Sequence, residues 1–298
     1  MKNVFRDYHP AVNVLWAALV LAGAMGLHHP VSLAISLGCA VLWSVRLGGR
    51  KSARFAVRGM LPLLVITALL NPLFSHEGVT ILWYFPNGNP LTMESICYGI
   101  SAGVVLVSVI LWFSGLTKVL TADKIMALFG KAVPSLALLL SMAMGMVPRF
   151  RRRLAVVRDN QKAIGRDPAE GTMVQRAKKG LQMLSILVTW SMEDAIQTAD
   201  SMKSRGYGLP DRTACDPCPM TERDKNALLV LGILGALLIG FWITGELQWQ
   251  YYPVLWGAEW NLRSVTAQVV YLAVCSFPMA LDGWTNRLWN RKREGETL

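Results

Sequence analysis

The sequence predicts an all-α, polytopic membrane protein with about six transmembrane helices and a further pair of helices on the cytoplasmic side. Of its 298 residues 53% are hydrophobic and only 16% are charged, whereas soluble domains carry about 25% charged residues. Several apolar runs approach or reach the roughly 20 residues that a helix needs to cross the hydrocarbon core. The basic residues gather in alternate links between these runs. Together these observations indicate a chain that is solvated mainly by lipid.

Six apolar runs are the candidate spans, and they cover residues 11–27, 30–45, 59–75, 96–116, 227–244 and 265–284. The second run is short, so its ends are less sharply defined than those of the others. We expect the first run to be a retained span rather than a cleaved signal peptide, because a second apolar run follows it at once.

The distribution of Lys and Arg predicts the orientation of these spans. One set of links carries the basic residues Lys2, Arg6, Arg46, Arg50, Lys51, Arg54, Arg58, Arg287, Arg291, Lys292 and Arg293. On the opposite side, links 26–29 and 76–95 contain no Lys or Arg, and link 246–264 contains only Arg263. By the positive-inside rule, both termini and the middle segment face the cytoplasm of a bacterial or archaeal cell.

The chain therefore divides into three parts: spans one to four in residues 1–132, a cytoplasmic or interfacial region in residues 133–225, and spans five and six with a basic tail in residues 226–298. The middle part contributes much of the formal charge of +11. Its basic residues suit an interface with anionic lipid. Nucleic acid is not an expected partner, since no recognised motif or interleaved aromatic residues accompany the charges.

The stretch "SMEDAIQTADSMKSRGYGLP", residues 191–210, ends an amphipathic helix. Its apolar stripe recurs at spacings of three or four residues and comprises Leu181, Leu184, Val188, Met192, Ala195, Ala199 and Met202. Gly206 is the expected left-handed cap, and Pro210 prevents the helix from continuing. Arg205 then lies in the last turn. It either complements the negative end of the helix dipole or presents its charge to a partner.

This stretch resembles the second signature of the transmembrane T component of energy-coupling factor (ECF) ABC transporters. There a helix with small and acidic residues runs into Ala-Arg-Gly and an aromatic residue, the places that Ser204, Arg205, Gly206 and Tyr207 occupy here. The first Ala-Arg-Gly of that family falls on "MVPRFRRRLAVVRDNQKAIGRD", where Ala163, Ile164 and Gly165 stand. Ile164 replaces the arginine, so either Arg166, two residues on, substitutes for it or the first contact is weaker or apolar. Lys203 is a second departure, because the family often has glutamate there.

The resemblance implies a coupling subunit that is not an enzyme and binds neither substrate nor cofactor. Two cytoplasmic ABC ATPase subunits would bind ATP and receive the helix ends at Ala163–Gly165 and Ser204–Gly206 in surface grooves. A separate substrate-binding (S-type) membrane subunit would capture a vitamin or a metal ion. In agreement, no phosphate-binding loop of the G-x-x-x-x-G-K type occurs in the sequence.

Two rival functions remain open from the sequence. A conventional ABC importer permease would form the substrate path itself, but its Glu-Ala-Ala loop signature is missing. A membrane-embedded enzyme would need a cluster of ionisable residues at membrane depth, which the runs lack. The pairs Cys215–Cys218 and His28–His29 have the spacing of metal or redox ligands, but no further ligands stand near them in the sequence. We expect incidental thiols and a solvated turn.

Overall fold

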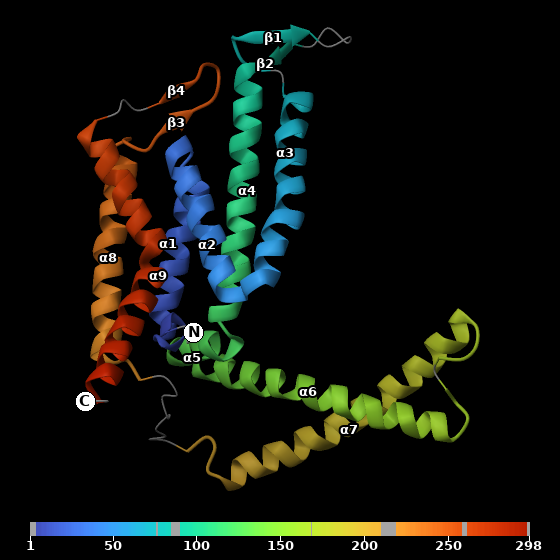
Figure 1. Ribbon diagram of the computed structural model, residues 1–298. Helices are drawn as coiled ribbons and strands as arrows, with labels where there is room; N and C mark the ends of the chain where they lie inside the picture. Colours follow the sequence, from blue (N-terminus) through green and yellow to red (C-terminus); the bar gives the residue numbers. More distant parts are fainter. Residues whose placement is uncertain are drawn as a thin grey trace. The chain divides into compact units, whose positions relative to one another are not determined.

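The computed structural model describes residues 4–75, 77–84, 90–167, 169–209, 219–257 and 261–296 (Figure 1). The chain forms two compact units, of which the first comprises Met1–Ile125 with Cys218–Leu298 and the second comprises Met126–Pro217. The all-α class predicted from the sequence is confirmed, because helices dominate both units.

In its described part, the first unit comprises apolar helices of different lengths and two short hairpins. Its helices are η1 (Val4–Asp7), α1 (Pro10–Gly26), α2 (Pro30–Phe55), the π-helical η2 (Ala56–Met60), α3 (Leu61–Phe74), α4 (Met93–Val119), α8 (Glu222–Ile243) and α9 (Leu262–Glu296). The antiparallel hairpins are β1 (Ile81–Tyr84) with β2 (Pro90–Thr92), and β3 (Trp249–Gln250) with β4 (Trp256–Gly257). These hairpins were not predicted from the sequence.

The predicted apolar runs all lie on helices of this unit. In the described residues, four stretches are long and apolar enough to cross a membrane: Pro30–Phe74, Met93–Val119, Glu222–Ile243 and Leu262–Thr285. The first has 45 residues, and a straight helix of that length would measure about 68 Å, more than twice the hydrocarbon core. The chain instead bends at Gly49, where φ is +57°, and turns back through η2 (Figure 1). It therefore supplies two helices, α2 and α3. Helix α1 is a shorter apolar helix, and the number of spans stays a prediction.

Aromatic side chains form the centre of the first unit. Phe5, Trp16, Trp43 and Trp112 meet edge to face, and the ring centroids of Trp16 and Trp112 lie 5.5 Å apart. The indole N–H of Trp16 donates to the Val274 carbonyl at 2.8 Å. Edge-to-face packing with a satisfied N–H is the favoured way to bury such rings, so these contacts join α1, α2, α4 and α9.

Helices α3 and α4 pack through small residues. A Cβ at Gly99 would stand 2.8 Å from the Ala68 carbonyl oxygen, and one at Gly103 would stand 2.7 Å from the Thr67 hydroxyl. The two glycines are one turn apart and let the backbones approach closely, as in the small-residue interfaces of membrane helices. The opposite side of α3 is exposed and apolar, as Leu69 and Leu73 show, and this face suits lipid.

The second unit is dominated by two long helices, α6 (Pro134–Ala163) and α7 (Met173–Ser204), which follow the shorter α5 (Ala122–Ala132). Pro148 lies inside α6, so the apolar residues 134–147 and the basic residues after them lie on one helix. The boundaries 1–132, 133–225 and 226–298 drawn from the sequence stay a prediction.

Candidate functional site: the ends of helices α6 and α7

The end of α7 is closed by its own backbone. Gly206 has φ +79°, and its N–H donates to the Lys203 carbonyl at 3.0 Å. The Tyr207 N–H donates to the Met202 carbonyl, also at 3.0 Å. This pair of bonds is the Schellman motif, in which a left-handed residue after the helix satisfies its last carbonyls. This geometry confirms the prediction that Gly206 adopts the left-handed capping conformation. Arg205 is the C-cap residue, directly before it.

The end of α6 has the same backbone geometry. Gly165 has φ +76° and donates to the Lys162 carbonyl at 3.0 Å, and the Arg166 N–H donates to the Gln161 carbonyl at 2.8 Å. Ile164 has φ −92° and ψ 19°, close to the −87° and 9° of Arg205. The motifs at 163–165 and 204–206 are therefore two copies of one local structure, which differ in whether isoleucine or arginine occupies the capping position.

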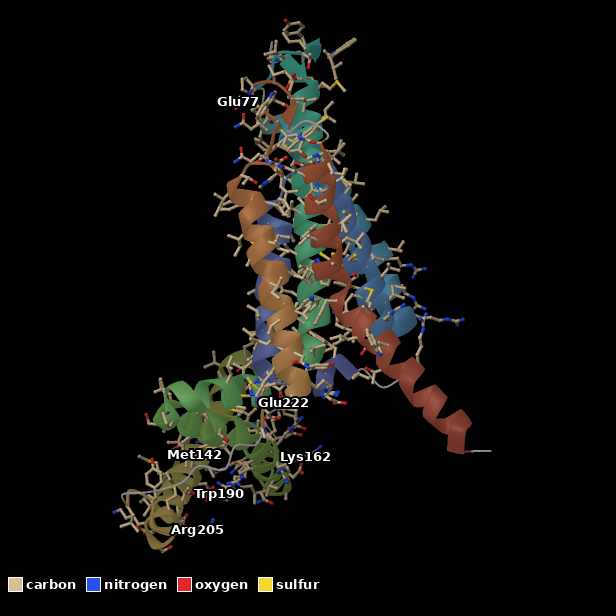
Figure 2. All side chains as sticks on the ribbon, turned by 90° about the vertical axis from the view of Figure 1, so that its left-hand side faces the viewer. Glu77, Met142, Lys162, Trp190, Arg205 and Glu222 are labelled. Atoms are coloured by element: carbon tan, nitrogen blue, oxygen red, sulfur yellow. The ribbon has the colours of Figure 1, made fainter. Side chains whose placement is uncertain are left out.

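The residues at both ends are open to solvent. The Ile164 side chain is 64% exposed, and Ala163 and Gly165 beside it are exposed as well. Arg205 is exposed and makes no ion pair with another described residue, while the Ser204 hydroxyl donates to the Ser201 carbonyl. Figure 2 shows Arg205 at the end of α7, beyond Trp190. The five N–H donors of the guanidinium are therefore available for hydrogen bonds to a partner protein.

The loop that follows Ile164 is tied to both helices. Lys179 Nζ on α7 donates to the carbonyls of Asp167 and Glu170, at 2.7 and 3.1 Å. The Asp167 carboxylate accepts from the Ala169 N–H at 2.9 Å and lies 3.7 Å from Lys162. The hydrogen bond from Ala169 lowers the pKa of Asp167 despite an opposing effect of burial, and Lys162 lowers it further. The end of α6 is consequently held in place on the hairpin.

The two helices meet near their middle. Arg153 on α6 forms an ion pair with Asp194 on α7 at 2.6 Å, and its guanidinium lies 5.8 Å from the centroid of the Trp190 ring. The hydrogen bond from Arg153 lowers the pKa of Asp194. Val157 and Leu187 are buried in this unit. The Arg153 and Asp194 side chains are 31% and 30% exposed, and ion pairs that solvent reaches contribute little to stability.

Much of the apolar surface of α6 and α7 is left exposed by the described residues. The apolar stripe predicted on α7 is real, but it faces outward: Leu181, Leu184, Val188 and Met192 are between 49% and 66% exposed. On α6, the apolar half exposes Leu136, Leu139, Leu140, Met144 and Val147. Contiguous exposed apolar surface marks an interaction site with protein or membrane.

The structure gives no support to the metal-site alternative. Among the described residues, no group of three or more His, Cys, Asp or Glu side chains is placed to hold a metal ion. Cys215 and Cys218 lie outside the described residues. His29 is buried, so the expected solvated turn was wrong for this residue. Its Nδ1 accepts from the Val31 N–H at 3.3 Å and caps α2, a role that the following Pro30 signals in the sequence.

No protein-family model matches the chain. It is 29% identical over 197 residues to a protein of Thermosediminibacter oceani named energy-coupling factor transporter transmembrane protein EcfT, covering 61% of this chain and 73% of the relative. EcfT of Lacticaseibacillus paracasei is 29% identical over 213 residues, covering 67% and 80%. EcfT of Brevibacillus brevis is 23% identical over 243 residues, covering 78% and 89%. The apolar helices and these relatives indicate a multi-pass membrane protein that is similar, over 61–78% of its length, to transmembrane proteins of energy-coupling factor transporters.

Proposed function

We propose that this chain is the transmembrane coupling subunit of an ECF-type ABC importer. The observation that carries the proposal is the pair of exposed Schellman ends on α6 and α7, at the two places where the sequence resembles the ATPase-docking motifs of the family. The relatives named EcfT support a transporter role. Two cytoplasmic ABC ATPase subunits would bind ATP, and each would receive one of these ends in a groove.

The second end suits a polar groove. Arg205 stays charged at any working pH and can make charge-assisted hydrogen bonds to carboxylates or helix-end carbonyls. Gly206 carries no side chain, so the partner backbone can approach closely behind the guanidinium. The Schellman bonds satisfy the helix carbonyls beforehand, which leaves the guanidinium donors for the partner rather than for its own helix.

The first end suits an apolar groove. Ile164 is exposed on the same backbone, and burying an isoleucine side chain contributes roughly 1.5–3 kcal/mol. Arg166 follows on the same cap and is exposed as well, so it remains the alternative polar contact. The two ATPase contacts would then differ in chemistry, and this difference can direct two unlike ATPase surfaces to different ends.

The exposed apolar faces of α6 and α7 suit a separate substrate-binding integral membrane subunit of the S type. In this arrangement the S-type subunit takes up a vitamin or a metal ion, and ATP-driven closure of the ATPases moves the two helix ends beneath it. The positive-inside pattern supports a cytoplasmic side for both termini and for α6 and α7, which would lie at the cytoplasmic membrane interface.

The alternative proposal is a conventional ABC importer permease that forms the substrate path itself, and a membrane-embedded enzyme is less well supported. Purification of the tagged full chain from its native membrane, with its partners identified by mass spectrometry, tests the choice. We expect ABC ATPase chains together with a separate small membrane protein that binds the substrate. Transport by this chain and the ATPases alone, after reconstitution in vesicles, would instead identify a permease.

A further inference from the structure

The turn between α2 and α3 carries four exposed basic side chains. The chain bends at Gly49 and turns back through η2 (Figure 1). The basic residues after the bend are Arg50, Lys51, Arg54 and Arg58, and all of them are exposed. Arg50 and Arg54 stand about one helical turn apart, where like charges repel each other. None of the four forms an ion pair with another described residue, so their positive charge is left uncompensated.

Helix α4 brings a fifth cation to the same turn. The Lys118 Nζ donates to the Ser52 hydroxyl at 2.9 Å, and a Cβ at Gly48 would stand 2.5 Å from this nitrogen. The sequence from residue 8 to residue 76 contains no Asp or Glu. The acidic residue of α4, Glu94, lies about 36 Å from Lys118 along the helix. The helices that bring these cations together therefore provide no carboxylate at this end.

The turn lies where a membrane span ends. From Pro30 to Gly49, α2 runs about 20 residues or about 30 Å, which matches the thickness of the hydrocarbon core. Apolar side chains on the same turn are exposed beside the cations, and these are Phe55, Val57 and Leu61. Exposed cations beside exposed apolar groups suit the boundary between hydrocarbon and headgroups, where basic side chains reach the charged lipid surface.

We propose that this turn binds one anionic glycerophospholipid of the cytoplasmic leaflet. The basic turn is the surface formed by Arg50, Lys51, Arg54, Arg58 and Lys118. Its N–H groups donate to the lipid phosphate, and an acyl chain lies along Val57 and Leu61. An acidic protein surface would neutralise the cations but leave the apolar side chains without cover. A zwitterionic lipid would cover the apolar side chains but bring a cation of its own to the basic turn.

The proposal goes beyond the orientation of the spans, because it requires a lipid that is held at one place on the chain. It concerns the first unit alone and does not depend on the coupling role.

Native mass spectrometry of the detergent-purified full chain tests the proposal. The probes are dioleoyl phosphatidylglycerol and dioleoyl phosphatidylcholine, which share their acyl chains and phosphate but differ in net charge. We expect stronger retention of phosphatidylglycerol. This preference should fall as the ammonium acetate concentration is raised, because salt screens exposed charges.

Arg54→Gln combined with Arg58→Gln tests the basic turn itself. This variant should weaken phosphatidylglycerol retention roughly 30-fold, because each basic residue near an anionic surface contributes about fivefold to binding. Retention of phosphatidylcholine should not change. Both side chains are exposed, so their loss should leave the fold intact, and thermal stability checks this. Arg54→Lys combined with Arg58→Lys keeps both charges and should bind like the wild type.

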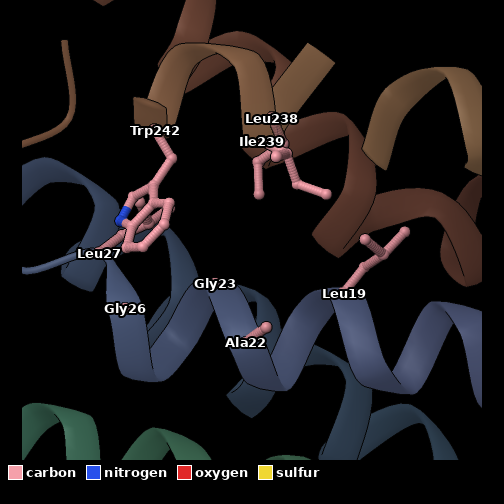
Figure 3. Close-up of a pocket in the computed structure, with 8 residues that line it drawn as sticks. All are labelled: Leu19, Ala22, Gly23, Gly26, Leu27, Leu238, Ile239 and Trp242. Carbon is pink, nitrogen blue, oxygen red and sulfur yellow. The ribbon is translucent and has the colours of Figure 1, made fainter. Parts of the chain in front are cut away.

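Two controls separate the basic turn from other surfaces of the first unit. Arg6→Gln combined with Arg263→Gln removes the same charge from exposed positions elsewhere, and it should retain phosphatidylglycerol like the wild type. Ala22→Phe fills an apolar groove of about 460 Å³ between α1 and α8, which no charged residue lines (Figure 3). It should leave the preference for phosphatidylglycerol unchanged.

Equal retention of the two lipids by the wild type would overturn the proposal. Unchanged phosphatidylglycerol retention in Arg54→Gln with Arg58→Gln would also overturn it, as would an equal loss in either control. If the same variant kept the lipid but lost a protein that co-purifies with the wild type, the basic turn would belong to an acidic protein surface instead.

Discussion

Arg205 and Ile164 occupy equivalent positions in two helix ends of the same backbone geometry. Both directly precede a glycine with positive φ and a pair of capping hydrogen bonds. Because the backbone conformation is the same at both helix ends, any difference in ATPase binding between them would come from the side chains and from the surfaces they meet. Substitutions at these two positions therefore test the proposed coupling role directly.

We expect Arg205→Ala to weaken association with the ATPase subunits roughly 30-fold or more, because truncating one partner of a buried charge pair leaves the other unsatisfied. Arg205→Lys should restore only part of the loss, since a point charge cannot replace the planar fork. Co-purification with the ATPases and substrate-stimulated ATP hydrolysis measure the effect.

Arg176→Ala is the control for this prediction, because Arg176 is an exposed arginine near the other end of α7. It should leave assembly unchanged. If Arg205→Ala weakened ATPase association only slightly and Arg205→Lys restored it fully, Arg205 would serve only as a positive charge that complements the helix dipole.

For the first end, we expect Ile164→Leu to be tolerated and Ile164→Ala to weaken the complex, because an apolar contact depends on buried area rather than on a particular atom. The same co-purification assay applies. If Ile164→Ala and Arg166→Ala both leave assembly and transport unchanged, the first end has no coupling role.

At the scale of the element, the two caps depend on glycine. Gly165→Ala and Gly206→Ala should each cost roughly 1–2 kcal/mol, because alanine disfavours the left-handed conformation. At Gly206 the new Cβ would also stand 3.0 Å from Leu209. Amide hydrogen exchange of the last turns should accelerate at Arg166 and Tyr207, respectively.

The matched control for the caps is Gly180→Ala, which lies inside α7 with nothing within 4 Å of the added Cβ. It should stabilise the helix by roughly 0.5–1 kcal/mol. If amide hydrogen exchange at the helix ends were unchanged in Gly165→Ala and Gly206→Ala, these glycines would not be the residues that cap the helices.

Local signals in the sequence predicted much of the helical fold and one end of the candidate site. The apolar runs predicted the helices of the first unit, and the Gly206–Pro210 pattern predicted the end of α7. Helix α6 continues through Pro148, because tertiary context can retain a helix that proline disfavours. The stripe on α7 predicted a helix but not what covers it, since periodicity identifies an apolar face and not its partner. His29 was misjudged because its burial depends on Trp249, 220 residues away in the sequence, whose ring lies 5.2 Å from the imidazole.

At the scale of the whole molecule, the positive-inside pattern predicts which links are accessible from outside. In a chain whose native cysteines are replaced by serine, a cysteine at Asn87 should react with an impermeant thiol reagent added outside the cell. A cysteine at Thr172, in the loop between α6 and α7, should react only after the membrane is permeabilised. Asn87 lies outside the described residues, so the expectation there rests on the sequence alone. The reverse labelling pattern would contradict both the orientation and the proposed ATPase contacts.

The contact between Arg153 and Asp194 has a mechanical consequence. From Arg153 to Ile164 along α6, and from Asp194 to Arg205 along α7, each helix runs about 16 Å, so the two arms would be equal if this contact acted as a pivot. A rotation of about 10° at this pivot would displace each tip by about 3 Å, which follows from the helix rise alone. The side chains of the ion pair at this contact are 31% and 30% exposed, so the pair by itself would oppose such a rotation only weakly. In the proposed coupling role, ATPase closure on either tip would therefore move the apolar face of the same helix as well.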